Sequence, residues 1–207
     1  MSYLRDPAAI YAESFATIER EADLSSLPPE LRSAAIRMIH ACGMIDLVTD
    51  IVGDPAVVEA TIAALWEGKP VFCDCEMVHA GIIADAMPQN NELVVTLNDR
   101  AIRDIAKSLA TTRSAAAVEL WRDRLAGAVV VIGNAPTALF HLLEIIASGA
   151  PKPAAIIAAP VGFVGAAESK ALLAGAGIPY LSVRGRRGGS AITSAAFNAI
   201  AKQSAAR

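Results

Sequence analysis

The sequence predicts an α/β protein with a three-layer, doubly wound, mainly parallel sheet of five strands and an N-terminal helical segment. The first observation is that five short apolar runs after residue 68 alternate with segments of helical periodicity. Fully apolar runs of this length are typical of parallel strands that helices cover on both faces. The second is that the residues before position 68 carry repeated helix-start signals. Together these patterns favour a single domain over residues 1–207.

The first 66 residues are predicted to be helical. Asp6 followed by proline is a helix cap with a proline in the first turn, and apolar residues follow at helical spacing. A second helix is predicted to begin at Pro29 and to run to about Cys42. A third is predicted to begin at Pro55 and to end near Gly68.

The five expected strands are residues 70–73, 93–97, 128–132, 154–158 and 179–183. Strands wound in this way give a flavodoxin-like sheet, whose ligands bind beyond the carboxyl ends of the strands. Glycine-containing loops follow the last three strands at 133–137, 160–165 and 184–190. Glycine lets a ligand approach the backbone closely, and helix N-termini favour anions. None of the loops has the spacing of a phosphate-binding loop or of the GxGxxG motif.

The composition excludes several classes of protein. Apolar residues make up 54% of the 207 residues and the mean hydropathy is +0.44, which argues against disorder. No stretch supplies the roughly 20 apolar residues of a membrane-spanning helix. Arg5 and Asp6 stand where a signal peptide would be apolar. Three cysteines without a secretion signal predict a reducing, cytoplasmic location.

The charge is distributed unevenly along the chain. The net charge of −3 gives no general case for binding nucleic acid. Residues 151–207 nevertheless carry a net charge of +6, whereas the first 150 residues carry −9. This asymmetry indicates either a local anion site in the last third of the chain or solvated basic helix faces.

His40 is the candidate for proton transfer. On a helical wheel it lies opposite the apolar stripe of its helix, and therefore faces solvent or a cleft. Arg37, three residues earlier, can share that face. An imidazole is a natural proton donor or acceptor near neutral pH. The alternative interpretation is a plain surface histidine.

Ser14 and Arg113 are candidates for ligand binding. Ser14 places a hydroxyl on an apolar stripe, where it either bonds a ligand or bonds back to its own helix. Thr112 is expected to cap a helix over residues 113–125, which places Arg113 in the first turn, against the helix dipole. An anion bound there would explain this placement, and a tolerated surface arginine is the alternative.

The cysteines offer a weaker pattern. Cys73 and Cys75, with His79 four residues further on, supply only three soft ligands, and their spacing is not that of a zinc ribbon. Buried thiols are the favoured interpretation, so no metal site is predicted.

Several of these stretches resemble the precorrin-8X methylmutases, and the resemblance runs from about Asp6 to about Asn198. RMIHACG at 37–43 resembles the histidine motif of that family, and TRSAAA at 112–117 its arginine motif. The other matching stretches are VFCDCEMV at 71–78, IGNAPTALF at 132–140, PVGFVGAAESK at 160–170 and GRRGGS at 185–190. One departure is Thr111, where an asparagine is expected before the Thr-Arg pair.

The resemblance implies an isomerase of cobalamin biosynthesis that moves a methyl group from C11 to C12 of a corrinoid macrocycle and gives hydrogenobyrinate. No cofactor and no covalent intermediate are expected. His40 is implied to be the general acid, and Ser14, Arg37 and Arg113 to contact the substrate. The substrate carries several carboxylates, with which the loop arginines Arg184, Arg186 and Arg187 could also pair. The resemblance further implies a homodimer with the active site near the subunit interface.

Three alternatives stay open at this point. One is the same reaction on the cobalt-containing precursor of the anaerobic branch, in which case the metal belongs to the substrate. A second is a corrinoid carrier without turnover. A third is a nucleotide-binding protein that uses the glycine loops near Gly133 and Gly188, against which the absence of a phosphate-loop lysine counts.

Overall fold

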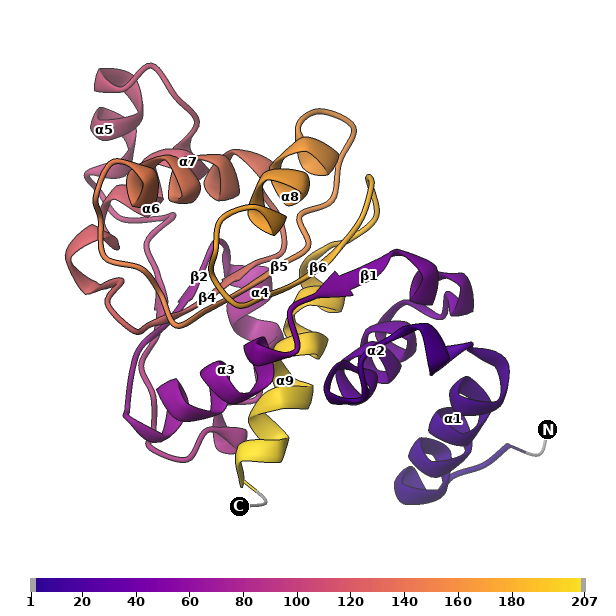
Figure 1. Ribbon diagram of the computed structural model, residues 1–207. Helices are drawn as coiled ribbons and strands as arrows, with labels where there is room; N and C mark the ends of the chain where they lie inside the picture. Colours follow the sequence, from indigo (N-terminus) through magenta and orange to yellow (C-terminus); the bar gives the residue numbers. More distant parts are fainter. Residues whose placement is uncertain (1–2, 206–207) are drawn as a thin grey trace.

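The computed structural model describes residues 3–205 and has a six-stranded sheet between two layers of helices (Figure 1). The strands are β1 (Ile51–Gly53), β2 (Val71–Cys73), β3 (Leu93–Val95), β4 (Val129–Ile132), β5 (Ala155–Ala158) and β6 (Tyr180–Val183). The α-helices are α1 (Pro7–Glu21), α2 (Pro29–Cys42), α3 (Ala56–Trp66), α4 (Glu76–Gly81), α5 (Ile102–Ser108), α6 (Arg113–Glu119), α7 (Pro136–Ala147), α8 (Ala166–Ala174) and α9 (Ser190–Ala205). The 3₁₀ helices are η1 (Leu24–Ser26), η2 (Ile45–Asp50), η3 (Ala84–Ala86) and η4 (Arg122–Arg124).

The strand order is β1-β6-β5-β4-β2-β3, and all pairs except β1 with β6 are parallel. The first parallel strand, β2, therefore lies inside the sheet. The chain places β3 on one side of it and then returns to build β4, β5 and β6 on the other side. This is the doubly wound, flavodoxin-like order that the sequence predicts, with its switch point between β2 and β4.

The predicted number of strands was wrong, because the sheet has a sixth strand, β1. Ile51–Gly53 pairs antiparallel with β6 and forms one edge of the sheet. It is only three residues long and lies between η2 and α3, inside the stretch predicted to be helical. A strand this short carries no alternating pattern, so the sequence gives no signal for it.

Two hydrophobic cores cover the two faces of the sheet, because alternate residues of each strand point to opposite sides. Within β4, Val129 and Val131 pack with α2, α3, α4 and α9, whereas Val130 and Ile132 pack with α6, α7 and α8. The strand residues of β4 and β5 are all buried. The prediction of a sheet covered on both faces is thus confirmed.

The N-terminal helices begin close to where the prolines predict. Asp6 caps α1 by accepting a hydrogen bond from the backbone of Ala8, and α2 ends at Gly43, whose φ of 69° lies in the left-handed region. Helix α1 buries only Ile18 of its fifteen residues. It lies at the periphery of the molecule and packs on α2 (Figure 1).

Helix α6 is shorter than the predicted 113–125. It ends at Glu119, and a 3₁₀ turn follows. The turn buries Trp121, whose ring stacks on Phe72 at a centroid distance of 5.2 Å and whose indole N–H donates to Thr96 at 2.8 Å.

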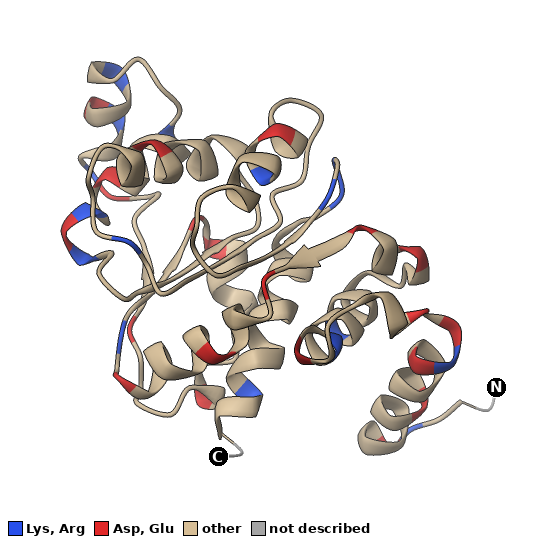
Figure 2. Cartoon of the chain, in the orientation of Figure 1, with Lys and Arg blue, Asp and Glu red and all other residues tan. Residues whose placement is uncertain are grey.

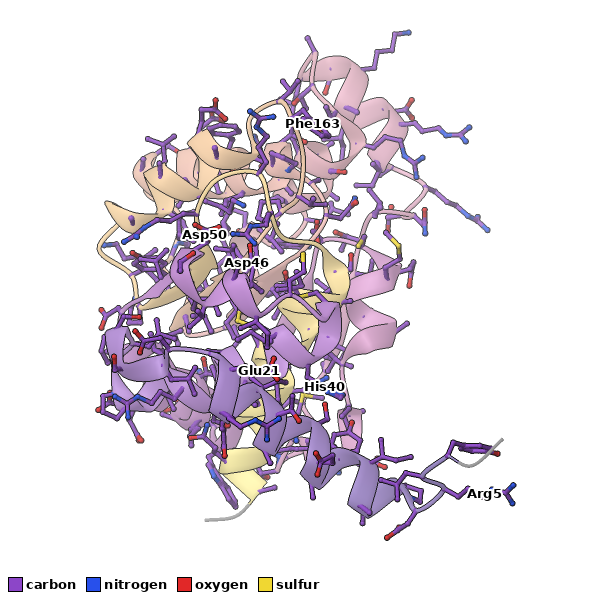
Figure 3. All side chains as sticks on the ribbon, turned by 90° about the vertical axis from the view of Figure 1, so that its right-hand side faces the viewer. Arg5, Glu21, His40, Asp46, Asp50 and Phe163 are labelled. Atoms are coloured by element: carbon purple, nitrogen blue, oxygen red, sulfur yellow. The ribbon has the colours of Figure 1, made fainter. Side chains whose placement is uncertain are left out.

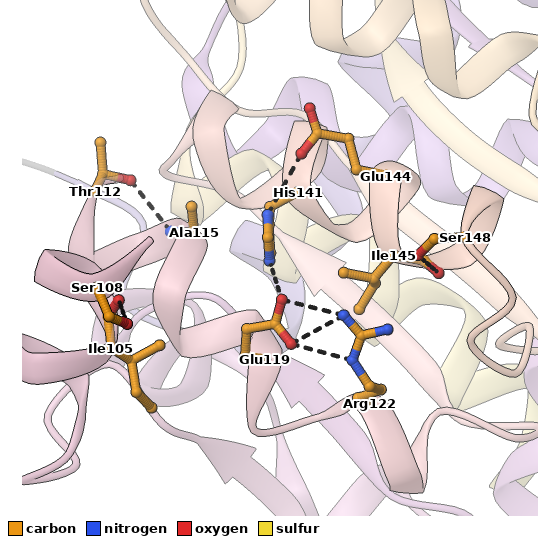
Figure 4. Close-up of polar contacts among 10 residues, drawn as sticks. All are labelled: Ile105, Ser108, Thr112, Ala115, Glu119, Arg122, His141, Glu144, Ile145 and Ser148. Carbon is orange, nitrogen blue, oxygen red and sulfur yellow. Dashed lines mark hydrogen bonds and ion pairs between the residues drawn. The ribbon is translucent and has the colours of Figure 1, made fainter. Parts of the chain in front are cut away.

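A polar cluster joins α6 to α7 (Figure 4). The carboxylate of Glu119 contacts Nε2 of His141 at 2.6 Å and accepts two hydrogen bonds from Arg122. The other ring nitrogen of His141 lies 3.4 Å from the carboxylate of Glu144. Burial by itself raises the pKa of Glu119, but the hydrogen bonds from His141 and Arg122 outweigh it, and the pKa is lowered.

We predict that Glu119→Gln destabilises the protein by about 1–2 kcal/mol near pH 7. Because the pKa of Glu119 is lower in the folded state, its contribution is present above the ordinary carboxyl pKa and is lost as the pH falls through the folded value. The difference between variant and wild type should therefore shrink in acid. Urea unfolding near neutral pH and again near pH 3 measures it. Glu144→Gln, at a largely exposed carboxylate, is the matched control, and an equal effect from both variants would contradict the prediction.

Candidate active site

Ser14 and His40 are brought into direct contact by the packing of α1 on α2. The hydroxyl oxygen of Ser14 lies 2.8 Å from Nδ1 of His40. His40 is exposed, on the side of α2 away from the buried Leu31 and Met38. The Ser14 hydroxyl therefore bonds the imidazole and fixes the orientation of the ring.

Aromatic side chains surround this pair. The rings of Tyr11 and Phe15 lie with their centroids 5.3 and 5.4 Å from that of His40. The guanidinium of Arg37 lies over Phe15 at 5.3 Å. Figure 3 shows His40 on the side of the molecule where α1 projects.

A mainly apolar cavity of about 390 Å³ opens beside the pair, lined by Ile10, Ile39 and Ile45 together with Ser14 and His40. This is an apolar surface with a proton donor or acceptor at its edge.

Arg113 lies elsewhere. Thr112 caps α6 as predicted, and Arg113 donates to the carbonyl of Leu97 at 3.2 Å and to the side chain of Asn98 at 3.1 Å. A cavity of about 340 Å³ at this point is also lined by Arg100 and Arg103, so cations predominate around it. Helix α6 packs on the opposite face of the sheet from α2. Within the described chain, no contact joins Arg113 to the His40 cluster.

Asp74, the residue after β2, occupies the switch point of the sheet, which is the place between β2 and β4 where the direction of winding reverses. Its buried carboxylate accepts backbone N–H bonds from Gly133, Asn134 and Ala135 at 3.0, 2.9 and 2.8 Å. Burial raises the pKa of Asp74, and these three N–H groups counter that shift. The three N–H groups form the kind of concave site that binds phosphate in other folds of this class. Here a side chain of the protein occupies it.

Because Asp74 already accepts these three N–H bonds, the loop at Gly133 does not offer them to a phosphate. The nucleotide-binding alternative thereby loses its main support. Gly133 is also closely packed, since a Cβ there would lie 2.8 Å from atoms of Val78 and Ser190. The loop at 133–137 is therefore a packed structural junction. A third cavity, of about 370 Å³, lies beside it and is lined by Cys42 and Met77 and by residues 188–192.

The basic loop after β6 lies at the same edge as the acidic residues of η2 (Figure 2). Arg187 donates to Asp46 at 2.7 Å and to Asp50 at 3.0 Å, and the hydrogen bond with Asp50 raises the pKa of Arg187 further. Arg184 and Arg186 are exposed. Of the three arginines that the sequence offers for an anion, Arg187 is thus already neutralised within the chain.

Both cysteines of the 73–75 stretch are buried, and burial raises the pKa of each thiol. The sulfur of Cys75 lies 3.6 Å from the hydroxyl of Ser190. Across residues 3–205, no group of three or more histidine, cysteine or acidic side chains is arranged to hold a metal ion.

Sequence reasoning missed several residues of this region. Tyr11 and Phe15 count in the sequence only among the apolar residues at helical spacing in α1, and Tyr11 is 47% exposed. Asp74 carried no signal except its position directly after a buried strand. Lys170 is not singled out as a buried charge by the sequence, and it is only 4% exposed. A buried charge can be recognised only from the contacts that surround it.

Comparisons with known proteins agree with the geometry. A family model described as precorrin-8X methylmutase matches residues 9–203. The precorrin-8X methylmutase of Pseudomonas aeruginosa is 52% identical over 205 residues, which cover 98% of this chain and 99% of that protein. The cobalt-precorrin-8 methylmutase of Priestia megaterium is 36% identical and covers 94% of this chain and 87% of its own length. A crystal structure of precorrin-8x methyl mutase from Thermus thermophilus superposes with a TM-score of 0.87 at 34% identity, over 96% of this chain and 97% of that one.

The fold and these matches define an isomerase of cobalamin biosynthesis. The chain belongs to the precorrin-8X methylmutase family. In residues 3–205, no helix combines the length and the apolar character that crossing a membrane requires.

We predict that Asp74→Asn lowers the free energy of unfolding by about 2–3 kcal/mol. An amide in this place turns two N–H donors of its own toward backbone N–H groups and leaves some of them unpaired. Urea unfolding followed by circular dichroism measures the loss. Asp85→Asn, at an exposed position, should change stability by less than about 0.5 kcal/mol. A stability of Asp74→Asn equal to that of the control would show that the three hydrogen bonds do not hold the switch point.

Proposed function

We propose that this chain moves the methyl group of metal-free precorrin-8X from C11 to C12 and releases hydrogenobyrinate, with His40 as the general acid. The observation that supports the role of His40 most directly is its 2.8 Å contact with Ser14 at the edge of an apolar cavity. Because the reaction is an isomerisation, the proton given to the macrocycle must return to the enzyme. A histidine suits this use, since it exchanges protons near neutral pH.

The Ser14 hydroxyl occupies Nδ1 of the imidazole, which leaves Nε2 to face the substrate. A proton placed on the conjugated macrocycle by Nε2 selects the tautomer from which the methyl group migrates. Tyr11 and Phe15 hold the ring on two sides, so the donor is positioned before the substrate arrives.

Arg37 and Arg113 are proposed to bind carboxylates of the substrate. Both side chains present a guanidinium, which pairs with a carboxylate through two hydrogen bonds. Arg113 is held by Leu97 and Asn98, so it keeps its place in the absence of ligand. The substrate is thus recognised by an apolar surface and by cations at its margin.

The metal-free substrate is favoured over the cobalt-containing one. Two relatives named precorrin-8X methylmutase are each 52% identical to this chain. The cobalt-precorrin-8 methylmutase of Priestia megaterium is 36% identical to it. The cobalt form is the second candidate substrate. If it is used, the metal is part of the substrate and no protein ligand for it is required.

We further propose that residues 1–207 act as one domain, in a cytoplasmic homodimer whose active site lies near the interface. The three free cysteines fit a reducing compartment. The dimer would explain why the proposed substrate residues come from opposite faces of the sheet. His40, Ser14 and Arg37 of one protomer would then complete a site with Arg113 of its partner.

We predict that the wild-type protein converts metal-free precorrin-8X to hydrogenobyrinate and that His40→Ala loses nearly all turnover, on the order of 10²–10⁴-fold. Ser14→Ala should lose less, about tenfold, because the imidazole remains but is oriented less well. Anaerobic absorption spectroscopy follows the reaction, and Ser108→Ala, at an exposed helix residue, is the control.

Product binding separates an enzyme from a carrier. His40→Ala should still bind hydrogenobyrinate, since only the proton donor is removed. A normal rate in this variant would reject the general-acid role. Binding without turnover of either the metal-free or the cobalt substrate by wild type would favour the carrier.

A shared site predicts complementation between subunits. His40→Ala and Arg113→Ala should each be nearly inactive at low substrate concentration. Unfolding and refolding them together in equal amounts should restore about a quarter of the wild-type activity, because half of the dimers are mixed and each holds one intact site. Sedimentation equilibrium checks that dimers form. Absence of any recovery in mixed dimers would place His40 and Arg113 in the same subunit's site.

A further inference from the structure

Two loops at the carboxyl ends of β5 and β6 are joined to each other at their bases. The backbone N–H of Gly162 donates to the carbonyl of Arg186 at 3.1 Å, and that of Gly189 donates to Ala159 at 2.8 Å. Gly188 allows this approach, since a Cβ there would lie 2.0 Å from the carbonyl oxygen of Ala159. The first loop (159–165) and the second (184–189) therefore form one rigid unit, which we call the paired loops.

Lys170 and Arg187 fix the paired loops to the body of the protein. Lys170, from α8, is 4% exposed and donates to the carbonyl of Arg187 at 2.7 Å. Burial lowers the pKa of Lys170 to about 8. The side chain of Arg187 reaches across to Asp46 and Asp50 of η2. The charged groups of Lys170 and Arg187 thus make the contacts that hold the second loop in place.

The tip of the paired loops is exposed in an unusual way. Phe163 and Val164 are 88% and 90% exposed, the highest values among the large apolar residues in 3–205. The guanidinium of Arg186 lies over the Phe163 ring at 5.5 Å. The tip thus combines an exposed aromatic ring with a cation above it, and hydrogen bonds hold the bases of its two loops together. Such an arrangement is a preformed binding surface.

Arg184, in the same loop, points elsewhere. It lines a separate cavity of about 410 Å³ with Val52, Tyr180 and Lys170, between β1 and α8. The three arginines of the loop therefore have three different surroundings, and only Arg186 combines exposure with an aromatic partner.

We infer that Arg186, stacked on Phe163, binds a carboxylate at the rim of the corrinoid substrate, while the ring and Val164 contact its apolar part. This inference rests on the proposed function. The paired loops also border the 370 Å³ cavity at the switch point, through Val161 and Gly188, so the tip continues a surface suited to ligand binding. A substrate that is apolar on its faces and anionic at its margin matches both parts of the tip.

The position of the tip defines what it can do. Figure 3 shows Phe163 and His40 at different ends of the molecule, with Asp46 and Asp50 between them. A group at the other end of the chain from His40 is proposed to reach a substrate held by the His40 site of the partner subunit, as proposed above for Arg113. There Arg186 pairs with a carboxylate, which stands at the margin of the macrocycle and not at its reacting carbons. Arg186 and Phe163 therefore contribute to affinity and leave the chemical step unchanged.

The test compares Arg186→Gln with Arg184→Gln, two variants of one loop with the same change in charge. Turnover of metal-free precorrin-8X and fluorescence titration of hydrogenobyrinate are measured at several salt concentrations. Arg186→Gln should raise KM and the product Kd about tenfold, with kcat within about twofold of wild type and with a weaker dependence of affinity on salt. Arg184→Gln should change KM by less than about twofold.

Phe163 supplies the second half of the test. Phe163→Ala should raise KM about fivefold and Phe163→Trp should restore affinity, because an aromatic face is retained. The double variant of Arg186 and Phe163 should be weaker than wild type by less than the product of the single effects, since the two groups act together. Sedimentation of each variant is measured in parallel.

The outcomes separate this inference from the proposed function. Conversion by wild type with equal KM values for Arg186→Gln and Arg184→Gln would overturn the inference alone. Dissociation of a dimer in Phe163→Ala, with unchanged affinity in Arg186→Gln, would also overturn it and would assign the tip to subunit contact. Failure of wild type to bind or convert either corrinoid would overturn the proposed function, and this inference with it.

Discussion

The carboxylate of Asp74 is the contact on which the centre of the molecule depends. It joins the end of β2 to the three backbone N–H groups that begin the connection from β4 to α7. This is the position where the winding of the sheet reverses, and where many folds of this class bind a phosphate. By supplying its own acceptor there, the chain closes the usual nucleotide position. The end of α2 and the loops after β5 and β6 line the cavity that stays open beside it.

The local features of the fold were predictable because they depend on neighbours in sequence. Prolines and caps fix the starts of α1 and α2, and continuous apolar runs fix the five parallel strands. β1 was not predictable, since its three residues form a strand only by pairing with β6. Helix α6 ends at Glu119, two residues before Trp121, which packs on Phe72, a partner almost fifty residues away. Such endings are decided by tertiary contacts that no local pattern contains.

The candidate site shows the same division. Periodicity alone places His40 outside the core, and its exposure agrees. Its bond with Ser14 joins two residues that are 26 positions apart in the chain, on different helices, and could not be read from either helix. Likewise, three neighbouring arginines look equivalent in sequence, yet Arg187 meets two carboxylates whereas Arg186 meets an aromatic ring. Charge in a sequence indicates how many ionic contacts are available, and only the fold decides which of them are satisfied internally.

Helix α1 carries half of the Ser14–His40 pair, yet it inserts a single fully buried side chain, Ile18, into the core. Helices attached so shallowly open at a much lower free energy than the sheet to which they are joined. The Ser14–His40 pair is therefore attached to one of the least cooperative parts of the molecule. On warming, this pair should lose its geometry while the six-stranded sheet is still intact. The temperature up to which Ser14 and His40 stay in contact is then set by the contacts that hold α1 in place. The stability of the sheet core against unfolding is a poor guide to that temperature.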